Sequence, residues 1–136
     1  MLLKFQKLEI PKIKTEQFIM SPIELKDYID FEVKRVYFIS QPQSDAGGHC
    51  HKEELELFVM QQGSCTAVID QGRGKEEIAM QAPQTVLYIG NYVWHYFKDF
   101  SQDAILLALS STNYNPARSD YIEDYEEYQE FLKTLK

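Results

Sequence analysis

Three histidines occur in the chain, and two of them, His49 and His51, are separated by a single residue. Alternate residues of an extended strand point to the same side, so a strand here would present both imidazoles on one face. A carboxylate, Glu56, follows after a short bend. Two imidazoles beside a carboxylate suit either proton transfer or metal ligation, and the two chemistries have to be weighed against each other.

The metal interpretation adds the third histidine, His95, on a later predicted strand. The spacing His49-x-His51-x4-Glu56-x6-Gly63 matches the first motif of the cupin barrels at every position. Imidazole and carboxylate ligands would suit Fe, Mn, Ni or Zn, with an open position for substrate. The second cupin motif is poorly matched, because neither the Pro-x-Gly before His95 nor the Asn after it is present.

The metal-free interpretation uses the histidines as proton carriers, since an unperturbed imidazole titrates near neutral pH. The predicted strand from Phe31 to Ser40 places Arg35 and Tyr37 on one face. A tyrosine hydroxyl there can polarise or protonate a carbonyl oxygen. This trio suits proton abstraction beside a ketone through an enediol, which is a ketose-type isomerisation.

Each of these residues also has a purely structural interpretation. Tyr37 could be a core tyrosine with a satisfied hydroxyl, Arg35 a surface residue, and His95 and Trp94 packed core side chains. Their position on strands of a predicted jelly roll, whose interior is a ligand pocket, favours a functional role.

The order of predicted elements indicates an all-β, cupin-type antiparallel jelly roll or barrel in a single domain over residues 1–136. Short β-rich segments recur with turn signals between them, and no helix separates them. A helix is expected from about 120 to 135, with Asp120 as N-cap and Glu123 as its capping-box partner. The expected strands are Leu3–Ile10, Phe31–Ser40, His49–His51 continuing through Leu55–Gln61, Ser64–Asp70, Lys75–Met80, Thr85–Ile89, Tyr92–Phe97 and Ala104–Ser110.

Composition narrows the partners and the compartment. The net charge of −7 argues against a nucleic-acid or anionic-membrane partner, which requires a basic face. Cys50 and Cys65 form no CxxC pair, and free thiols suit a reducing cytosol. Lysines interrupt the apolar residues of the N-terminal segment too often for a signal peptide or a membrane span. We therefore expect a soluble cytoplasmic protein.

Several separated motifs together resemble the dTDP-sugar 3,4-ketoisomerases, a branch of the cupin superfamily, over roughly residues 31–126. The motifs occur in the family's order and spacing. They are Arg35-Val36-Tyr37-Phe38-Ile39, Gly47-x-His49-x-His51-Lys52, Gly63-Ser64, Leu87-Tyr88-Ile89-Gly90, Val93-Trp94, Asp99-Phe100-Ser101, Leu106-Leu107-x-Leu109-x-Ser111 and Asp120-Tyr121-Ile122.

The resemblance implies a homodimer with the N-terminal strand exchanged between subunits. It implies metal-free conversion of dTDP-4-keto-6-deoxyglucose to a 3-keto-6-deoxyhexose, without a cofactor, on the way to a dideoxyaminosugar of a lipopolysaccharide O-antigen. The catalytic residues carried over by position are His49, His51 and Tyr37. Arg35, Asn91, Trp94 and His95 are expected to contact the substrate. The face on which C4 is protonated, which separates galacto from gluco product, is left open, as is the identity of the nucleotide.

Three positions depart from this family pattern. Ala46 and Glu123 stand where the family usually carries arginine, and Glu56 stands where it usually carries glutamine. Glu56 restores the cupin ligand set His49, His51, Glu56 and His95, so a metal-dependent cupin stays an alternative. The missing arginines leave open a third alternative, a non-catalytic protein that binds nucleotide sugars.

Overall fold

The computed structural model of the chain describes residues 2–135. It is built mainly of β-strands, with two short helices. In chain order the elements are β1 (Phe5–Glu9), β2 (Ile13–Lys14), β3 (Ile19–Met20), α1 (Leu25–Tyr28), β4 (Arg35–Ser40), β5 (Ala46–His51), β6 (Glu56–Gln62), β7 (Ser64–Asp70), β8 (Lys75–Gln81), β9 (Thr85–Ile89), β10 (Trp94–Lys98), β11 (Ile105–Ser110), β12 (Tyr121–Ile122) and α2 (Tyr125–Lys133).

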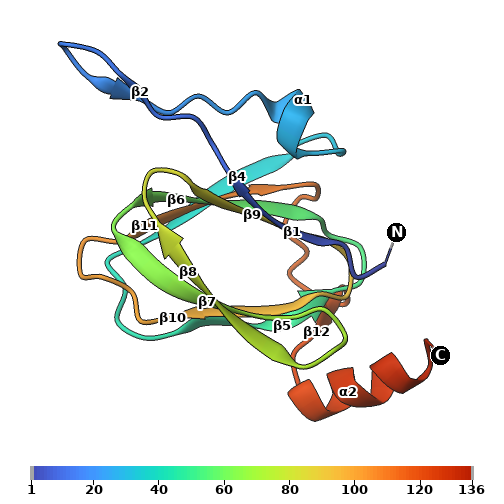
Figure 1. Ribbon diagram of the computed structural model, residues 1–136. Helices are drawn as coiled ribbons and strands as arrows, with labels where there is room; N and C mark the ends of the chain where they lie inside the picture. Colours follow the sequence, from blue (N-terminus) through green and yellow to red (C-terminus); the bar gives the residue numbers. More distant parts are fainter. Residues whose placement is uncertain (1, 136) are drawn as a thin grey trace.

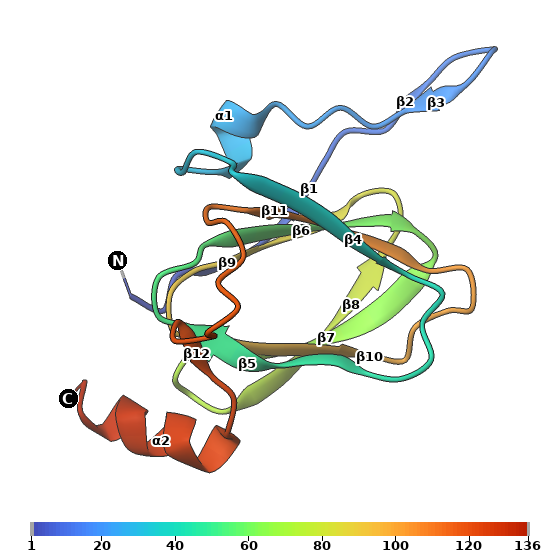
Figure 2. The same ribbon diagram turned by 180° about the vertical axis from the view of Figure 1, so that it is seen from behind.

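Two five-stranded sheets face each other, as Figures 1 and 2 show. One has the order β1-β9-β6-β11-β4 and the other β12-β5-β10-β7-β8. Neighbouring strands are antiparallel, and several consecutive strands alternate between the sheets. This arrangement confirms the predicted jelly roll with a C-terminal helix.

The core lies between the two sheets because each strand turns alternate side chains inward. Phe58 and Leu106 from the first sheet meet Ile69 and Phe97 from the second, and all four are buried. In β4 the alternation is complete, since Arg35, Tyr37 and Ile39 are partly buried while Val36, Phe38 and Ser40 are exposed. The predicted shared face of Arg35 and Tyr37 is therefore confirmed.

Both sheets are also covered on their outer faces. The segment around α1 packs Ile23, Tyr28 and Phe31 against the first sheet. Helix α2 covers the second sheet with Tyr128, which is fully buried and whose hydroxyl donates to the carbonyl oxygens of Tyr92 at 2.6 Å and Asp70 at 3.1 Å. These coverings allow the strands to be apolar on both sides, as the fully buried β9 is.

The prediction that His49–His51 continues into Leu55–Gln61 as one strand was wrong. The chain leaves one sheet at His51 and enters the other at Glu56, so β5 and β6 lie in different sheets. The bend places the histidines and Glu56 on facing sheets, where they meet across the barrel interior. A continuous strand would have kept Glu56 on the sheet that carries the histidines.

The helix start was also predicted wrongly. Asp124 caps α2, its side chain accepting from the backbone N–H groups of Glu126 and Glu127. The preceding residues, Tyr121 and Ile122, form a strand that pairs with His51 and Cys50 of β5. Asp120 therefore does not cap the helix, and its side chain points toward His51. Within residues 2–135, no helix is long and apolar enough to cross a membrane.

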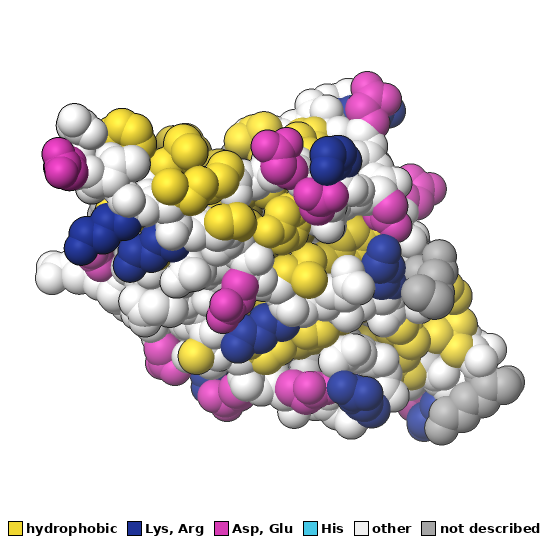
Figure 3. All heavy atoms as spheres, turned by 45° about the horizontal axis from the view of Figure 1, so that its top comes forward, with side chains coloured by type: hydrophobic (Ala, Val, Ile, Leu, Met, Phe, Trp, Pro, Cys, Tyr) yellow, Lys and Arg dark blue, Asp and Glu magenta, His cyan; other side chains and the backbone are white. Residues whose placement is uncertain are grey.

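An N-terminal hairpin, β2–β3, projects from the body of the molecule (Figures 1 and 2). Its strands pair only with each other in the single chain, and it exposes Ile13, Phe18, Ile19 and Met20. Figure 3 shows hydrophobic side chains gathered on the face of the molecule seen when the top of Figure 1 is turned forward. Strand β1 itself pairs with β9 of the same chain.

Candidate active site

Four strands bring the predicted site residues together inside the barrel. His49 and His51 come from β5, His95 from β10, Glu56 from β6 and Tyr37 from β4. His95 is the direct cross-strand partner of His49. His51, Glu56 and His95 are each at most 3 % exposed. Alternation along each strand points these side chains to the interior, where they meet in one cluster.

The two neighbouring histidines face each other through their Nε2 atoms, 3.1 Å apart. One nitrogen must donate and the other accept, so Nε2 carries a proton on one ring and none on the other. Burial, reinforced by the charges of His95 and His51, lowers the pKa of His49 to about 2. Burial also acts to lower the pKa of His51, but the hydrogen bonds that His51 donates to Asp120 and Glu56 outweigh it and raise the pKa to about 9. At neutral pH His51 is the cation and donor, and His49 is the neutral acceptor.

Asp120 fixes the orientation of His51. Its Oδ2 lies 3.0 Å from His51 Nδ1, and its Oδ1 accepts from the backbone N–H of Glu53 at 2.5 Å. Burial alone would raise the pKa of Asp120, but these bonds hold it below the usual range. Because Nδ1 is bound to a carboxylate, Nε2 is the nitrogen that His51 presents to the site.

Glu56 links the tyrosine to the histidines. Tyr37 donates to Glu56 Oε2 at 2.5 Å, and Glu56 Oε1 lies 3.2 Å from His51 Nε2 and 3.5 Å from His95 Nε2. Burial acts to raise the pKa of Glu56, but His51 and His95 hold it well below the usual value. Burial and the nearby Glu56 charge raise the pKa of Tyr37 far above its usual value, so Tyr37 stays a phenol.

Arg35 braces the side of the site next to Tyr37. Its Nη2 contacts both carboxylate oxygens of Glu54, at 3.1 and 3.2 Å, and Thr112 donates to Glu54 Oε1 at 2.9 Å. The guanidinium carbon lies 5.3 Å from the centre of the Tyr37 ring. Nη1 is buried without a hydrogen-bond partner among the described residues, which leaves a donor available to a ligand.

A cavity of about 360 Å³ opens onto these residues. It is lined by Arg35, Tyr37, His49, His51, Tyr114, Arg118 and Tyr121. Tyr114 and Arg118 come from the segment that connects β11 to β12, and Tyr121 is the first residue of β12; none of the three was predicted from the sequence to line the site. The motif Asp120-Tyr121-Ile122 was the available signal, but it was interpreted as a helix start. Tyr121 packs its ring 4.8 Å from that of His49 and 4.5 Å from that of His51.

Three residues expected to contact substrate, Asn91, Trp94 and His95, lie outside the lining of this cavity. His95 is buried behind it, with its ring 4.8 Å from that of His49. Trp94 is buried on the outer side of the second sheet with Cys50 and Tyr128, beneath α2. Asn91 donates from Nδ2 to the carbonyl oxygen of Lys52 at 3.1 Å. Trp94 faces away because it alternates with His95 along β10. Cys50 lies in the same cluster because it alternates with His49 and His51 along β5.

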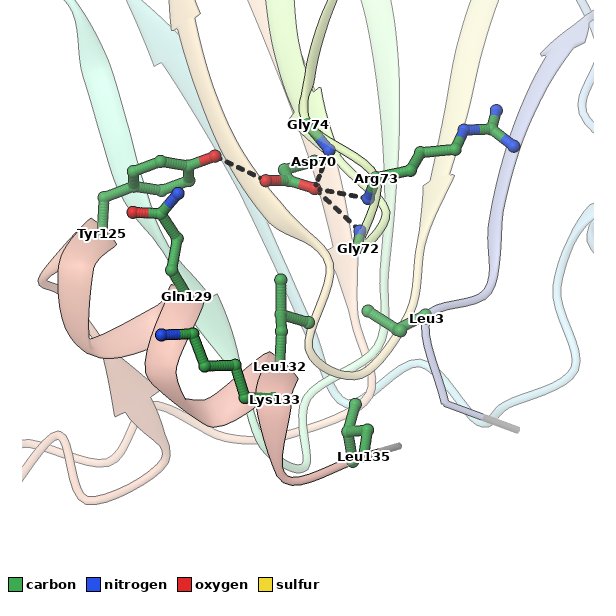
Figure 4. Close-up of a pocket in the computed structure, with 10 residues that line it drawn as sticks. All are labelled: Leu3, Asp70, Gly72, Arg73, Gly74, Tyr125, Gln129, Leu132, Lys133 and Leu135. Carbon is green, nitrogen blue, oxygen red and sulfur yellow. Dashed lines mark hydrogen bonds between the residues drawn. The ribbon is translucent and has the colours of Figure 1, made fainter.

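A second cavity, of about 430 Å³, lies between α2 and the β7–β8 hairpin (Figure 4). At its centre Asp70 Oδ1 accepts from the backbone N–H groups of Gly72, Arg73 and Gly74 at 2.7, 3.2 and 3.2 Å. Tyr125 donates to Oδ2 at 2.6 Å. Asp70 has thus filled its acceptor positions in closing the turn and holding α2, and contacts no histidine.

The imidazoles and carboxylates could also hold a cation. Ligand atoms of His49, His51 and His95 lie within 4.8 Å of one another, as do those of His51, Glu54 and Glu56. This donor set fits a divalent transition metal in its chemistry. A metal would have to displace the proton that His51 carries at neutral pH, because metal binding requires neutral imidazole.

Comparisons with known proteins give one consistent family. Residues 4–133 match the family model FdtA, described as WxcM-like, C-terminal. TDP-4-oxo-6-deoxy-alpha-D-glucose-3,4-oxoisomerase of Aneurinibacillus thermoaerophilus is 32 % identical over 130 residues, covering 94 % of this chain and 92 % of the relative.

Two solved structures are similar over nearly their whole length. A sugar 3,4-ketoisomerase of Thermoanaerobacterium thermosaccharolyticum in complex with TDP is 30 % identical, with a TM-score of 0.87, covering 99 % of this chain and 98 % of the other. A 3,4-ketoisomerase of Helicobacter canadensis is 32 % identical, with a TM-score of 0.84, and the match covers 95 % and 97 % of the two chains.

Proposed function

Because this chain belongs to the FdtA family, WxcM-like, C-terminal, we propose that it is a nucleotide-sugar 3,4-ketoisomerase. The substrate is dTDP-4-keto-6-deoxyglucose and the product a dTDP-3-keto-6-deoxyhexose, in agreement with the relatives of that activity. One observation carries the chemistry. Two imidazoles face each other at 3.1 Å with their pKa values displaced in opposite directions, which supplies a base and an acid side by side.

In the first half of the reaction His49 is the base. Its neutral Nε2 removes the proton from C3, which is acidified by the adjacent C4 ketone, while the imidazolium of His51 gives its Nε2 proton to O4. The C–H electrons form the C3=C4 bond, and the C4=O4 π electrons take up the new proton. The product of this half is an enediol, and its formation requires no oxidant or reductant.

The second half returns the proton to C4. The protonated His49 delivers it there, and the O3–H proton passes to the Tyr37 oxygen as the Tyr37 proton moves to Glu56 Oε2. C3 becomes the ketone. Glu56 is then protonated on Oε2 and His51 is neutral. Once the carboxyl proton has moved to Oε1, its transfer to His51 Nε2, 3.2 Å away, restores the starting state. Tyr37 and Glu56 thus serve as the route for the hydroxyl proton.

The test is to incubate the protein with dTDP-4-keto-6-deoxyglucose in deuterated water and follow C3 and C4 by NMR. We expect loss of the C3 proton signal and a 3-keto product whose C4 configuration the spectra define. Protium at C4 would show direct transfer by His49, and deuterium would show that the His49 proton exchanges with solvent before delivery. Absence of both exchange and product would refute the proposal. Thermal stabilisation by dTDP without turnover would instead identify a non-catalytic binding protein.

A metal-dependent cupin is the second candidate, favoured by the cluster of His49, His51, His95 and Glu56. These residues would hold the ion, which would supply Lewis-acid stabilisation of an enediolate. Elemental analysis of protein purified without added metal, followed by assay with a chelator, separates the candidates. Stoichiometric metal and chelator-sensitive turnover would show that the enzyme is metal-dependent and would refute the metal-free mechanism.

We further propose that two copies associate through the N-terminal arm. A two-stranded hairpin is marginally stable alone, and β2–β3 exposes Phe18 at 57 %. Val36 and Phe38 of the edge strand β4 are exposed as well. Exchange of this arm would cover both apolar surfaces. Light scattering should give twice the chain mass of 15.9 kDa, and a monomer would refute it.

The buried free thiols of Cys50 and Cys65 fit work in the reducing cytoplasm.

A further inference from the structure

A cavity that binds the diphosphate of a nucleotide sugar requires positively charged side chains, and the overall charge of the protein is negative. The chain carries a net charge of −7, and three carboxylates, Glu54, Glu56 and Asp120, lie beneath the cavity floor. A nucleotide sugar brings a further negatively charged diphosphate. Among the residues that line the cavity, two arginines, Arg35 and Arg118, carry permanent positive charge.

Arg35 already forms an ion pair within the protein. Its Nη2 binds both oxygens of Glu54, whose side chain is 3 % exposed, so its charge is largely balanced by a buried carboxylate. The free Nη1 is itself buried and lies deep in the site rather than at its mouth. Arg35 therefore suits contact with the sugar more than contact with a solvated diphosphate.

Arg118 lies at the edge of the cavity and is accessible. Its side chain is 39 % exposed, and its guanidinium carbon sits 3.9 Å from the centre of the Tyr121 ring, which packs against both catalytic histidines. Tyr121 thus separates the guanidinium from the imidazoles by one ring. Its counter-ion is Glu123, with Nη2 and Oε1 2.7 Å apart, and Glu123 is itself 54 % exposed.

The backbone around Arg118 holds it in place. Arg118 adopts the left-handed conformation, with φ of 54°, which non-glycine residues occupy at a cost. The turn is closed by hydrogen bonds from Arg118 N to the Asn115 carbonyl and from Tyr121 N to the Arg118 carbonyl. Asn115 Oδ1 also accepts from Ala117 N. An uncommon conformation held by these bonds fixes the direction in which the arginine leaves the chain.

We propose that Arg118 binds the diphosphate of the nucleotide sugar and that Glu123 is the counter-ion it releases on binding. This rests on the proposed function, because the sugar has to lie against His49 and His51. When the sugar lies against His49 and His51, the diphosphate extends toward the cavity edge, where Arg118 lies. A guanidinium matches two phosphate oxygens at once, and an exposed ion pair with Glu123 is weak enough to be exchanged.

The test measures affinity without turnover, by calorimetry with TDP and with thymidine, which lacks phosphate. Arg118→Gly keeps the left-handed backbone accessible, and Arg118→Lys keeps the charge but loses the planar fork. Arg118→Gly should bind TDP about 10- to 100-fold more weakly, as expected for losing charge-assisted hydrogen bonds, with thymidine affinity unchanged. Arg118→Lys should fall between wild type and Arg118→Gly.

The matched control is Arg73→Ala, which removes another exposed arginine paired with a glutamate, Glu76, at 3.0 Å, away from the cavity. It should bind TDP like wild type. Glu123→Gln, which removes the competing charge, should bind TDP severalfold more tightly. Wild-type TDP affinity in Arg118→Gly, or a Glu123→Gln that binds no more tightly, would overturn the inference. Arg118-dependent TDP binding in a protein without isomerase activity would refute the reaction while leaving the inference intact.

Discussion

Two buried carboxylate centres lie on the two sides of the β5–β10–β7 sheet, and they differ in how their oxygens are used. Asp70, on the outer side, accepts from three backbone N–H groups and the Tyr125 hydroxyl. Glu56, on the inner side, has Oε1 between His51 and His95 without a well-formed hydrogen bond among the described residues. The first centre is saturated by backbone N–H groups and a phenol, whereas the second is incompletely satisfied and borders imidazoles.

The comparison shows that cavity size does not identify the reactive site. The cavity beside Asp70 is the larger, about 430 Å³ against about 360 Å³. The smaller one holds imidazoles with displaced pKa values, an orphaned arginine nitrogen and a phenol bound to a carboxylate. Buried groups that are coupled and incompletely satisfied mark functional sites better than volume does.

The largest effect is expected for His51→Asn. It removes the acid of the pair and the group that recovers the proton from Glu56, so isomerase turnover should fall by about 10²- to 10⁴-fold, the range for losing a general acid or base. Initial rates by NMR or coupled assay measure it. Far-ultraviolet circular dichroism like that of wild type shows that the fold is kept. Turnover within a few fold of wild type would contradict the assignment of His51.

Asp120→Asn should lower kcat by about 10- to 100-fold, since one charge-assisted hydrogen bond contributes roughly 1.5–3 kcal/mol. The amide can no longer stabilise the His51 cation, whose pKa should fall from about 9. The pH profile of kcat distinguishes this from simple misfolding, because its alkaline limb should move to lower pH. A lower kcat with an unshifted profile would argue that Asp120 acts only as a structural residue.

Asp120 and Glu56 show how far the fold and the site could be predicted from the sequence. The strands of the jelly roll and the shared face of Arg35 and Tyr37 followed from β-rich segments and period-two alternation, which are local. Asp120 looked like a helix cap because Glu123 stands three residues on, but strand pairing with β5 is a non-local contact and prevailed. Glu56 was placed on the wrong sheet because nothing local marks the bend after His51. Tyr114 and Arg118 come from an irregular loop whose course depends on the whole barrel, and Tyr121 is placed by the pairing of β12 with β5.

Stability should fall as pH rises through the alkaline range. The folded-state pKa of His51 lies above that of the unfolded chain, so its contribution is complete below about 6.5 and is lost between about 6.5 and 9. The loss is at most on the order of 3 kcal/mol. Urea denaturation across this range measures it, with His51→Asn as the comparison, in which the slope should be flatter. An equal slope in both proteins would show that another group titrates in this window.

The smallest effect is expected on the outer side of the sheet. Tyr125→Phe removes the 2.6 Å hydrogen bond to Asp70 and leaves the three backbone N–H groups in place. The free energy of unfolding should fall by about 0.5–1.5 kcal/mol, the usual contribution of one hydrogen bond, because the ring and its packing against Trp94 are kept. Chemical denaturation gives the stability, and kcat should match wild type since no hydrogen bond joins Asp70 to a histidine among the described residues. A kcat lowered as much as in Asp120→Asn would mean that α2 transmits its position through Trp94 and β10 to His95, and the two carboxylate centres would then form one functional unit rather than two.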